Sequence, residues 1–549
     1  MAYLWDIINS TTMRNKKIQF DEDGRSKLLS GISKMAGAVK STLGPMGNTV
    51  LIESESHTRG ITVTKDGVTV AKSIKLSDAA EDLAVRIMRE ASERTATQAG
   101  DGTTTAIVLA EALVDWGTRM LGKPCNRTEV LRWMVKLTKD AVGIIKNKSK
   151  KVTNKTLRDV AIISANNDED LGGLIADAFM EVGESGIVTV EMSQGSETTY
   201  SATNGIKVDR GYTSPLFVNN QRKDECVLED TYILVSDAEI SNILQIERIL
   251  KPIIQENKKL LIIAPCNANV TNTLAANVMK NGLKICSIQP PSFGYKQHEL
   301  MQDIALSVGA NYYSEKTGDD LSLISFSDLG RASKVIVGRS DTIIIKEDGE
   351  SEEIGSRVSQ LREALADTTN VADRKHIENR IASLCGGIGV ISVGGATDLE
   401  QKELYDRVDD AVCAVKSAME EGILAGGGLT LFRIGNDWVS QSESNHKDKS
   451  EQIAKKILGH SLMRPLQQIY LNAGVTSDWE VEIRDGKDRS NMHRWYHGYN
   501  IKNGEYGNLI KMGVIDPAKV TRCALENAVS VAVTILSTNA IITFDEGDR

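Results

Sequence analysis

The hydrophobic and polar positions along the chain predict helices at both ends. Between about Asp21 and Lys40 the apolar residues recur on one face of a helix, at Leu28, Leu29, Ile32, Met35 and Val39. Further helices are predicted to about Asn147, and a short β-rich stretch, Asn48–Ile52, interrupts them. Helical patterns resume near residue 399 and continue with interruptions to residue 536.

The middle of the chain has a different pattern, in which short apolar runs alternate with helical segments. These runs are Ile187–Glu191, Tyr232–Val235, Leu260–Ala264, Ile285–Gln289 and Thr342–Ile345. Such an alternation is typical of an α/β domain. A basic, polar stretch, Lys146–Lys155, precedes it and is typical of a domain boundary. We therefore expect the two ends to form one domain, with the middle inserted into it.

The length and composition indicate a globular protein of several domains. Its 549 residues exceed what one core supports; 41% are apolar and 25% charged. The net charge of −9 argues against non-specific nucleic-acid binding, which needs a basic surface. No run approaches the roughly 18 uncharged apolar residues of a membrane span. Residues 1–17 do not have the pattern of a secretory signal. We expect no nucleic-acid and no membrane partner.

The cysteines indicate a reducing compartment. There are seven, scattered along the chain and never spaced Cys-x-x-Cys. This pattern fits neither a zinc site nor a disulfide framework. We therefore expect reduced, mostly buried thiols in a cytoplasmic protein.

Two glycine-rich strings carry the clearest chemistry, Thr42-Leu-Gly-Pro-Met-Gly47 and Gly100-Asp-Gly-Thr-Thr-Thr105. Glycine lets peptide N–H groups approach anionic oxygens closely, and threonine hydroxyls add donors. An apolar run, Ala106–Val114, follows the second string and predicts a buried helix with Asp101 at its N-cap. A carboxylate repels a phosphate unless a cation lies between them, so the string predicts a phosphate–Mg²⁺–Asp101 site. The alternative is a plain capped helix.

These strings belong to a collinear series that resembles the group I chaperonins of the GroEL type over nearly the whole chain. The other strings are Thr64–Val70, Ser164-Ala-Asn166, Asp209–Pro215, Ile240–Ile243, Met301–Ala305, Arg407–Ala411, Glu420–Gly428, Glu505–Asn508 and Asp516–Arg522. No single string is specific for the family, but the occurrence of all of them in the same order is.

The resemblance implies an α+β multidomain fold. Residues 1–147 and 421–549 would form a helical equatorial ATP-binding domain, 148–203 and 389–420 a small intermediate domain, and 204–388 an inserted α/β apical domain. It also implies a homo-oligomeric ring of about seven subunits, unfolded polypeptide clients, a co-chaperonin lid as a further partner, and the cytoplasm of a bacterium or of a virus-infected host.

The resemblance implies ATP, Mg²⁺ and K⁺ as cofactors. The matching positions are Thr42, Leu43, Gly44, Pro45 and Lys65 beside the phosphates and K⁺, Asp101 as Mg²⁺ ligand, Gly102, Thr103, Thr104 and Thr105 as phosphate donors, Gly427 beside the nucleotide, Asn500, Ile501 and Lys502 around the base, and Asp516 at the ribose. The family has small residues where Ile501 and Lys502 stand. Taken alone, the glycines 426–428 equally fit a helix C-cap.

The resemblance also implies that Asp410 activates the water that hydrolyses ATP, with Asp66 as a second carboxylate near the γ-phosphate. From the helical pattern alone, Asp410 lies off the apolar stripe and equally fits a solvated surface residue, and its neighbour Asp409 is an equal candidate. Asp410 falls in the predicted intermediate domain, so we expect it to approach ATP when that domain closes.

Client capture is expected on an apolar rim of the apical domain. The matching positions are Tyr212, Leu216, Phe217, Ile243 and Leu250, the last two on a helix predicted over 242–257. Glu247 stands on that helix where the family has leucine. The alternative for the apolar residues of this helix, including Ile246, Ile249 and Ile253, is simple domain core.

Some positions depart from the family. Gln467 and Thr476 replace the ion pair of the ring–ring interface, which predicts weak or nucleotide-dependent pairing of rings unless Trp479 or the long segment Ile483–His497 compensates. These departures are typical of a divergent member, such as a virus-encoded chaperonin. The competing functions are a passive holdase of the same fold and a kinase or P-loop ATPase, whose motifs do not occur in the sequence.

Overall fold

The computed structural model describes residues 16–544 except 54–59, 123–124, 184–185, 194, 222, 347–351, 369, 386, 443–447 and 476–494. The chain divides into two compact units. The first contains residues 1–176, 194–197 and 393–549, and the second contains residues 177–193 and 198–392. Both ends of the chain thus share one unit and the middle forms the other. The finer domain boundaries given above remain predictions.

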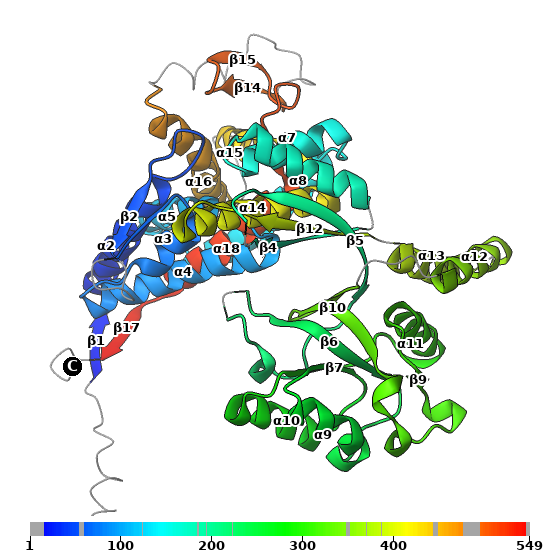
Figure 1. The fold of residues 1–549 in the computed structure, drawn as a ribbon. Helices are drawn as coiled ribbons and strands as arrows, with labels where there is room; N and C mark the ends of the chain where they lie inside the picture. Colours follow the sequence, from blue (N-terminus) through cyan, green and yellow to red (C-terminus); the bar gives the residue numbers. More distant parts are fainter. Residues whose placement is uncertain are drawn as a thin grey trace, which may run out of the picture. The chain divides into compact units, whose positions relative to one another are not determined.

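The first unit is built on helices from both ends of the chain. They are α2 (Asp21–Lys40), α3 (Gly67–Ser73), α4 (Ala79–Ala99), α5 (Thr103–Leu121), α6 (Arg127–Lys148), α7 (Asn154–Ser164), α14 (Asp398–Glu421), α15 (Leu429–Ser442), α16 (Lys449–Asn472) and α18 (Ala518–Ser537). Helices α7 and α14 pack on each other, and the other helices contribute to one apolar core. The C-terminal α18 packs against α4, α5 and α6 from the N-terminal part (Figure 1). The predicted helix over residues 21–40 is confirmed as α2.

Among the described residues, only α18 has the length and hydropathy of a membrane-spanning helix, and 67% of its apolar window is buried inside the protein. Its apolar surface is therefore accounted for by the core of the first unit.

Four pairs of short antiparallel strands complete this unit. They are β1 (Lys16–Phe20) with β17 (Ala540–Phe544), β2 (Val50–Glu53) with β3 (Ile61–Thr64), β13 (Ile423–Ala425) with β16 (Ile515–Pro517), and β14 (His497–Asn500) with β15 (Glu505–Asn508). The predicted β-rich stretch after α2 corresponds to β2.

The second unit is built on a nine-stranded mixed sheet in the order β4-β12-β5-β11-β10-β6-β7-β8, with β9 paired to β6. Its strands are β4 (Ile187–Met192), β5 (Thr199–Val208), β6 (Cys226–Ser236), β7 (Lys259–Ile263), β8 (Ile285–Ile288), β9 (Tyr312–Tyr313), β10 (Gly330–Val337), β11 (Thr342–Ile345) and β12 (Gly387–Val393). The neighbours β6, β7 and β8 are parallel. All five apolar runs predicted as strands lie in this sheet.

The helices of the second unit are α9 (Glu247–Gln255), α10 (Ala268–Asn281), α11 (Gly294–Val308), α12 (Glu352–Asp367) and α13 (Val371–Cys385). The remaining helix, α8 (Glu169–Val182), passes from the first unit into the second. In Figure 1, α9 and α10 lie along one side of the parallel strands.

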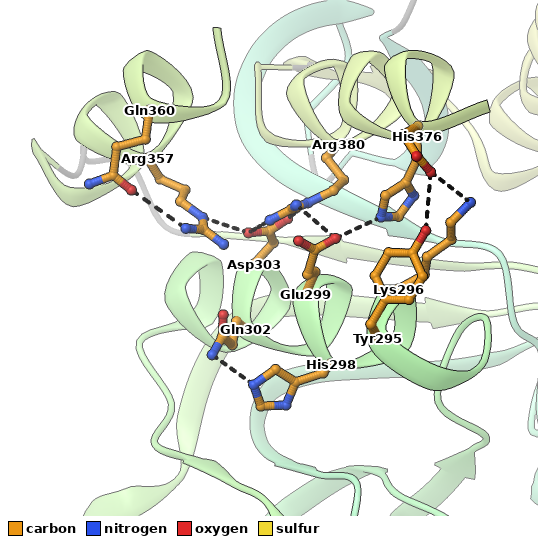
Figure 2. Close-up of polar contacts among 11 residues, drawn as sticks. Tyr295, Lys296, His298, Glu299, Gln302, Asp303, Arg357, Gln360, His376 and Arg380 are labelled. Carbon is orange, nitrogen blue, oxygen red and sulfur yellow. Dashed lines mark hydrogen bonds and ion pairs between the residues drawn. The ribbon is translucent and has the colours of Figure 1, made fainter. Parts of the chain in front are cut away.

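A buried ion-pair network joins α11 to the helical pair α12–α13 (Figure 2). Arg380 and Asp303 are each 3% exposed, and the guanidinium donates to both carboxylate oxygens, at 2.6 and 3.0 Å. Arg357 donates to the same carboxylate at 3.0 Å, while Glu299 pairs with Arg380 and His376. Because each buried charge has an opposite partner, this polar contact tolerates burial and fixes how the helices pack.

Candidate functional site

The loop between α4 and α5 places Asp101 between two glycines in the left-handed conformation. Gly100 (φ +75°) ends α4, and Gly102 (φ +83°) is the N-cap of α5. The prediction that Asp101 itself is the N-cap is therefore wrong. Asp101 precedes the cap by one residue, and its Oδ1 accepts a hydrogen bond from the Gly102 N–H. The first N–H groups of α5 consequently receive no side-chain cap and are left for another acceptor.

A second helix begins beside the first turn of α5. Asp66 caps α3, accepting from the backbone N–H groups of Val68 and Thr69 at 3.0 and 2.9 Å. A Cβ atom on Gly67 would lie 2.1 Å from the hydroxyl oxygen of Thr104 and 3.2 Å from that of Thr103. The contact is therefore possible only for glycine, and it joins the N-termini of α3 and α5. Because Asp66 already accepts from the first N–H groups of α3, the uncapped N–H groups of α5 are the ones left for an anion.

Helix α14 packs on the other side of the same loop. A Cβ atom on Gly100 would lie 2.1 Å from Cβ of Cys413, and the Ser417 hydroxyl donates to the Ala99 carbonyl at 3.0 Å. Asp410 precedes these residues by three and seven positions, so it shares their helix face. Asp410 is partly exposed and lies on the face of α14 that packs against the Asp101 loop, which argues against a fully solvated surface residue.

Burial and neighbouring carboxylates both act on the ionisation of this site. Burial raises the pKa of Asp410 well above its ordinary value, and the charges of Asp101 and Asp66 raise it further. Burial also raises the pKa of Asp101, and the charge of Asp66 adds to the effect. All three residues lie in the first unit, so Asp410 is already beside the loop in this conformation. Three enclosed carboxylates are costly unless a cation neutralises them.

This donor set fits Mg²⁺ held jointly with phosphate oxygens. Within the described ranges, no group of three or more His, Cys, Asp and Glu residues is arranged to hold a metal by itself. Mg²⁺ in nucleotide sites is usually held by one or two carboxylates, substrate phosphates and water. The arrangement thus matches a metal that arrives with a nucleotide better than a resident metal.

The turn after α2 contains a glycine in the left-handed conformation. Gly44 has φ +89°, and the Thr42 hydroxyl donates to the Val39 carbonyl at 2.9 Å. The side-chain amide of Asn472 on α16 donates to the carbonyls of Lys40 and Leu43, at 2.9 and 2.8 Å. Sequence analysis missed this support, because Asn472 lies far along the chain in a helix without a recognisable motif. The predicted Lys65 is exposed and directly precedes Asp66.

The glycines 426–428 connect β13 to the start of α15. The C-cap of α14 is Gly422, so the C-cap alternative for these glycines is wrong. Gly427 has φ +65°, and a Cβ atom there would meet no described atom within 4 Å. The Gly428 N–H donates to Asp516 Oδ2 at 3.2 Å. Burial raises the pKa of Asp516 to about 6, although the N–H groups of Gly428 and Gly427 oppose the rise.

The three residues predicted around the base lie at the end of β14 and in the turn that follows it. Asn500 is 8% exposed, and its Oδ1 accepts from the Lys502 N–H at 3.0 Å. The Lys502 ammonium donates to Asn167 Oδ1 at 2.9 Å, and Ile501 packs on an apolar cluster. These side chains therefore already have partners within the protein.

The predicted rim in the second unit needs correction. Phe217 and Leu250 are 1% and 6% exposed, so both are core residues and their predicted exposure is wrong. Leu216 is exposed, as expected, while Tyr212 and Ile243 are half-buried. Phe217 packs into the apolar core of the second unit, and Leu250 lies one helical turn after Ile246 on the core face of α9. The predicted helix over 242–257 begins as a 3₁₀ turn, Ile243–Ile246, which changes the direction of the residues that precede α9.

The most exposed apolar residue of this segment is Leu244, at 63%, which the α-helical pattern did not indicate. Ile246, Ile249 and Ile253 are buried, which confirms the core alternative for them. Glu247 is exposed and forms an ion pair with Lys251 at 2.9 Å.

Comparison with known proteins gives a consistent result. The family model described as the TCP-1/cpn60 chaperonin family matches residues 35–546. Two crystal structures of the chaperonin gp146 from bacteriophage EL 2 (Pseudomonas aeruginosa), both in the presence of ATP-BeFx, are similar in fold, with TM-scores of 0.69 and 0.62. Each is 24% identical in sequence, and each alignment covers 96% of this chain and 99% of the phage protein.

The raised pKa of Asp516 predicts a pH-dependent stability cost. Between its ordinary pKa of 3.8 and about 6, the folded chain binds a proton that the unfolded chain releases, so the free energy of unfolding falls as pH rises through this range. Asp516→Asn should therefore be more stable than the wild type at pH 7.5, by about 3 kcal/mol, and this difference should shrink at pH 4. Urea unfolding of both proteins at the two pH values measures it. An equal difference in the free energy of unfolding at both pH values would contradict the raised pKa of Asp516.

Proposed function

The chain belongs to the TCP-1/cpn60 chaperonin family, and we propose that it is an ATP-driven chaperonin that captures non-native polypeptides and assists their folding in a ring cavity. The observation that carries the proposal is the meeting of Asp410, the Asp101 loop and the paired N-termini of α3 and α5 in one place. Crystals of the phage chaperonin with this fold were obtained in the presence of ATP-BeFx, which supports a nucleotide as the ligand.

In the proposed site, the N–H groups and hydroxyls of Thr103, Thr104 and Thr105 bind the phosphate oxygens, which α5 favours through its dipole. Asp101 would hold Mg²⁺, which bridges the carboxylate to the phosphates and offsets their repulsion. Gly427 leaves room beside the nucleotide, and Asp516 would accept from the ribose hydroxyls. The Thr42–Pro45 turn offers carbonyl and hydroxyl oxygens, the ligand type that K⁺ takes.

Asp410 would orient and deprotonate the water that attacks the γ-phosphate. Its raised pKa means that burial and neighbouring carboxylates disfavour its charge, so a cation beside Asp101 would return it to the basic form. Because the charge of Asp410 depends on the cation, water would be activated only when the site holds Mg²⁺ and nucleotide. This dependence also argues against the passive holdase, which would not need three carboxylates enclosed together.

Client capture would use exposed apolar side chains of the second unit. Leu216, Leu244 and Met279 are 48%, 63% and 66% exposed, and contiguous exposed apolar side chains are typical of surfaces that bind other apolar surfaces. Glu247 lies on the same segment as Leu244 and carries a charge that an apolar client would have to desolvate.

Ring assembly would use the open strand pairs of the first unit. On β1 and β17, Ile18, Phe20 and Ile542 are 51%, 62% and 57% exposed. On β2 and β3, Leu51, Ile61 and Val63 are 70%, 61% and 55% exposed. Two-stranded ribbons with apolar side chains and free edges are marginal alone and tend to pair with other strands. We therefore propose that neighbouring copies cover them in a ring of about seven subunits.

The pairing of two rings stays a prediction. Gln467 accepts a hydrogen bond from Arg464 of its own helix, while Thr476, Trp479 and most of the segment 483–497 lie outside the described residues. The co-chaperonin lid likewise stays a prediction.

The role of Asp410 predicts a loss of hydrolysis without a loss of binding. Asp410→Ala should retain nucleotide affinity and slow ATP hydrolysis by a factor of about 10²–10⁴, because it removes water activation but no phosphate contact. Steady-state phosphate release and ADP affinity measure the two effects. Asp409→Ala is the matched control on the same helix and should hydrolyse ATP normally. Wild-type turnover in Asp410→Ala would refute this role.

The exposed carboxylate of Glu247 predicts weakened capture of apolar clients. Glu247→Leu should bind an unfolded apolar polypeptide more tightly and release it more slowly, since no charge has to be desolvated. Fluorescence anisotropy with a labelled, unfolded client reports both quantities. Glu229→Leu on β6, which also removes an exposed glutamate with a lysine partner, is the control. If both variants bind the client alike, this segment does not belong to the capture surface.

A further inference from the structure

A small apolar pocket in the first unit takes no part in the nucleotide site. It lies near the start of α2, the helix that packs beside β1 and β17, and the C-terminal parts of α5 and α18 complete it (Figure 1). Arg25 on α2 and Arg127 on α6 line the same pocket. An apolar surface that lies next to a few converging polar groups is typical of a binding site. The apolar side chains of the pocket are Leu28, Leu29, Val114, Leu121, Ile535 and Leu536.

The two arginines of the pocket converge on one neutral acceptor. The guanidinium groups of Arg25 and Arg127 both donate to Oδ1 of Asn539, at 2.9 and 3.1 Å. Among the side chains that the structure describes, no carboxylate forms an ion pair with either of them, whereas Arg119 and Arg132 each pair with an acidic residue of their own helix. Two cations that share a neutral acceptor repel each other, and a carboxylate beside them would relieve the repulsion and accept from both. The pocket therefore fits a carboxylate flanked by apolar groups.

The sequence that precedes β1 has this composition. Residues 3–8 read Tyr-Leu-Trp-Asp-Ile-Ile, and Asp6 is the only acidic residue before Lys16. In an extended segment alternate side chains share one face, so Leu4, Asp6 and Ile8 would point to the same side. The residues that follow β17 do not fit the pocket, because residues 545–549 contain no apolar side chain.

The chain is long enough for this contact within one copy. Residues 16–20 form β1, and Phe20 leads directly into α2, on which Arg25 lies. Phe20 pairs with Ala540, which places Asn539 at the same end of the strand pair. The path from Lys16 along β1 and α2 to Arg25 is about 20 Å. The ten residues from Asp6 to Lys16 span up to about 33 Å, so the segment can fold back along the strand pair.

We propose that residues 3–8 dock on this pocket of their own copy, with Asp6 accepting from Arg25 and Arg127 and with Leu4 and Ile8 on the apolar lining. The contact would bury apolar side chains and pair both arginines with a carboxylate. It would also fasten the start of β1, whose two-stranded pairing with β17 is marginal alone. The inference does not depend on the proposed nucleotide site.

Site-specific photo-crosslinking of the full chain tests the docking. p-Benzoylphenylalanine in place of Trp5 keeps an aromatic side chain beside Asp6 and reacts on irradiation with nearby C–H groups. Mass spectrometry of the digested product should find the cross-link on the apolar side chains of the pocket. The undigested product should keep the mass of one chain under denaturing conditions, because the segment docks on its own copy.

Charge variants test the role of the arginines. The double variant Arg25→Gln, Arg127→Gln should lower the cross-linked fraction about fivefold, as expected for the loss of a partly exposed ion pair. Asp6→Asn, which lies outside the folded core, should lower it as much. Arg119→Gln with Arg132→Gln is the matched control on α5 and α6 and should leave the fraction unchanged. Asp6→Lys combined with Arg127→Glu should restore part of the yield that either change alone removes.

Three results would overturn the proposal. Cross-links confined to residues outside the pocket would show that the segment docks elsewhere. A product with the mass of two chains would show that the segment belongs to the pocket of a neighbouring copy. An undiminished cross-linked fraction in Asp6→Asn and in the arginine double variant would show that the carboxylate and the two cations do not meet.

Discussion

The constraint on which this structure depends is the enclosure of three carboxylates, Asp66, Asp101 and Asp410, in one place. Their mutual repulsion and burial raise the pKa values of Asp101 and Asp410, so the protein alone does not stabilise their charges. The arrangement is useful only to a protein that receives a cation, and a phosphate-bound Mg²⁺ supplies one. Gly67 and Gly100 have no side chain, which lets α3 approach the start of α5 and lets α14 approach the Asp101 loop.

The site is assembled from segments that lie far apart in the sequence, and a shared core holds them. Helices from both ends of the chain, with α18 packed on α4 and α5, fix the Asp101 loop, while β13 and β16 bring the glycines 426–428 to Asp516. Part of the site opposes stability, since Asp516 stays buried with a pKa of about 6. A residue that lowers the stability of the folded chain is expected where the function of the site, rather than folding, determines which amino acid stands there.

Sequence analysis predicted features that depend on local pattern. The helix α2 and five strands of the second unit followed from periodicity. The sequence analysis misplaced the N-cap of α5 by one residue, since the cap depends on backbone dihedral angles. It predicted Leu250 to be exposed, because the pattern of one helix does not show which of its neighbouring apolar residues the rest of the unit covers. The contacts of Asn472 join distant segments, so no local pattern could reveal them.

The claim that a cation joins the carboxylates to the phosphates is tested most directly by the Mg²⁺ dependence of nucleotide affinity. The Kd of ADP would be measured for the wild type and Asp101→Ala over a range of Mg²⁺ concentrations. In the wild type, affinity should rise with Mg²⁺. In Asp101→Ala, which loses the metal ligand, most of this rise should disappear, and Asp115→Ala, an exposed-face aspartate on α5, should behave as the wild type. An identical Mg²⁺ dependence in Asp101→Ala and the wild type would contradict the account and return Asp101 to a purely structural role in its loop.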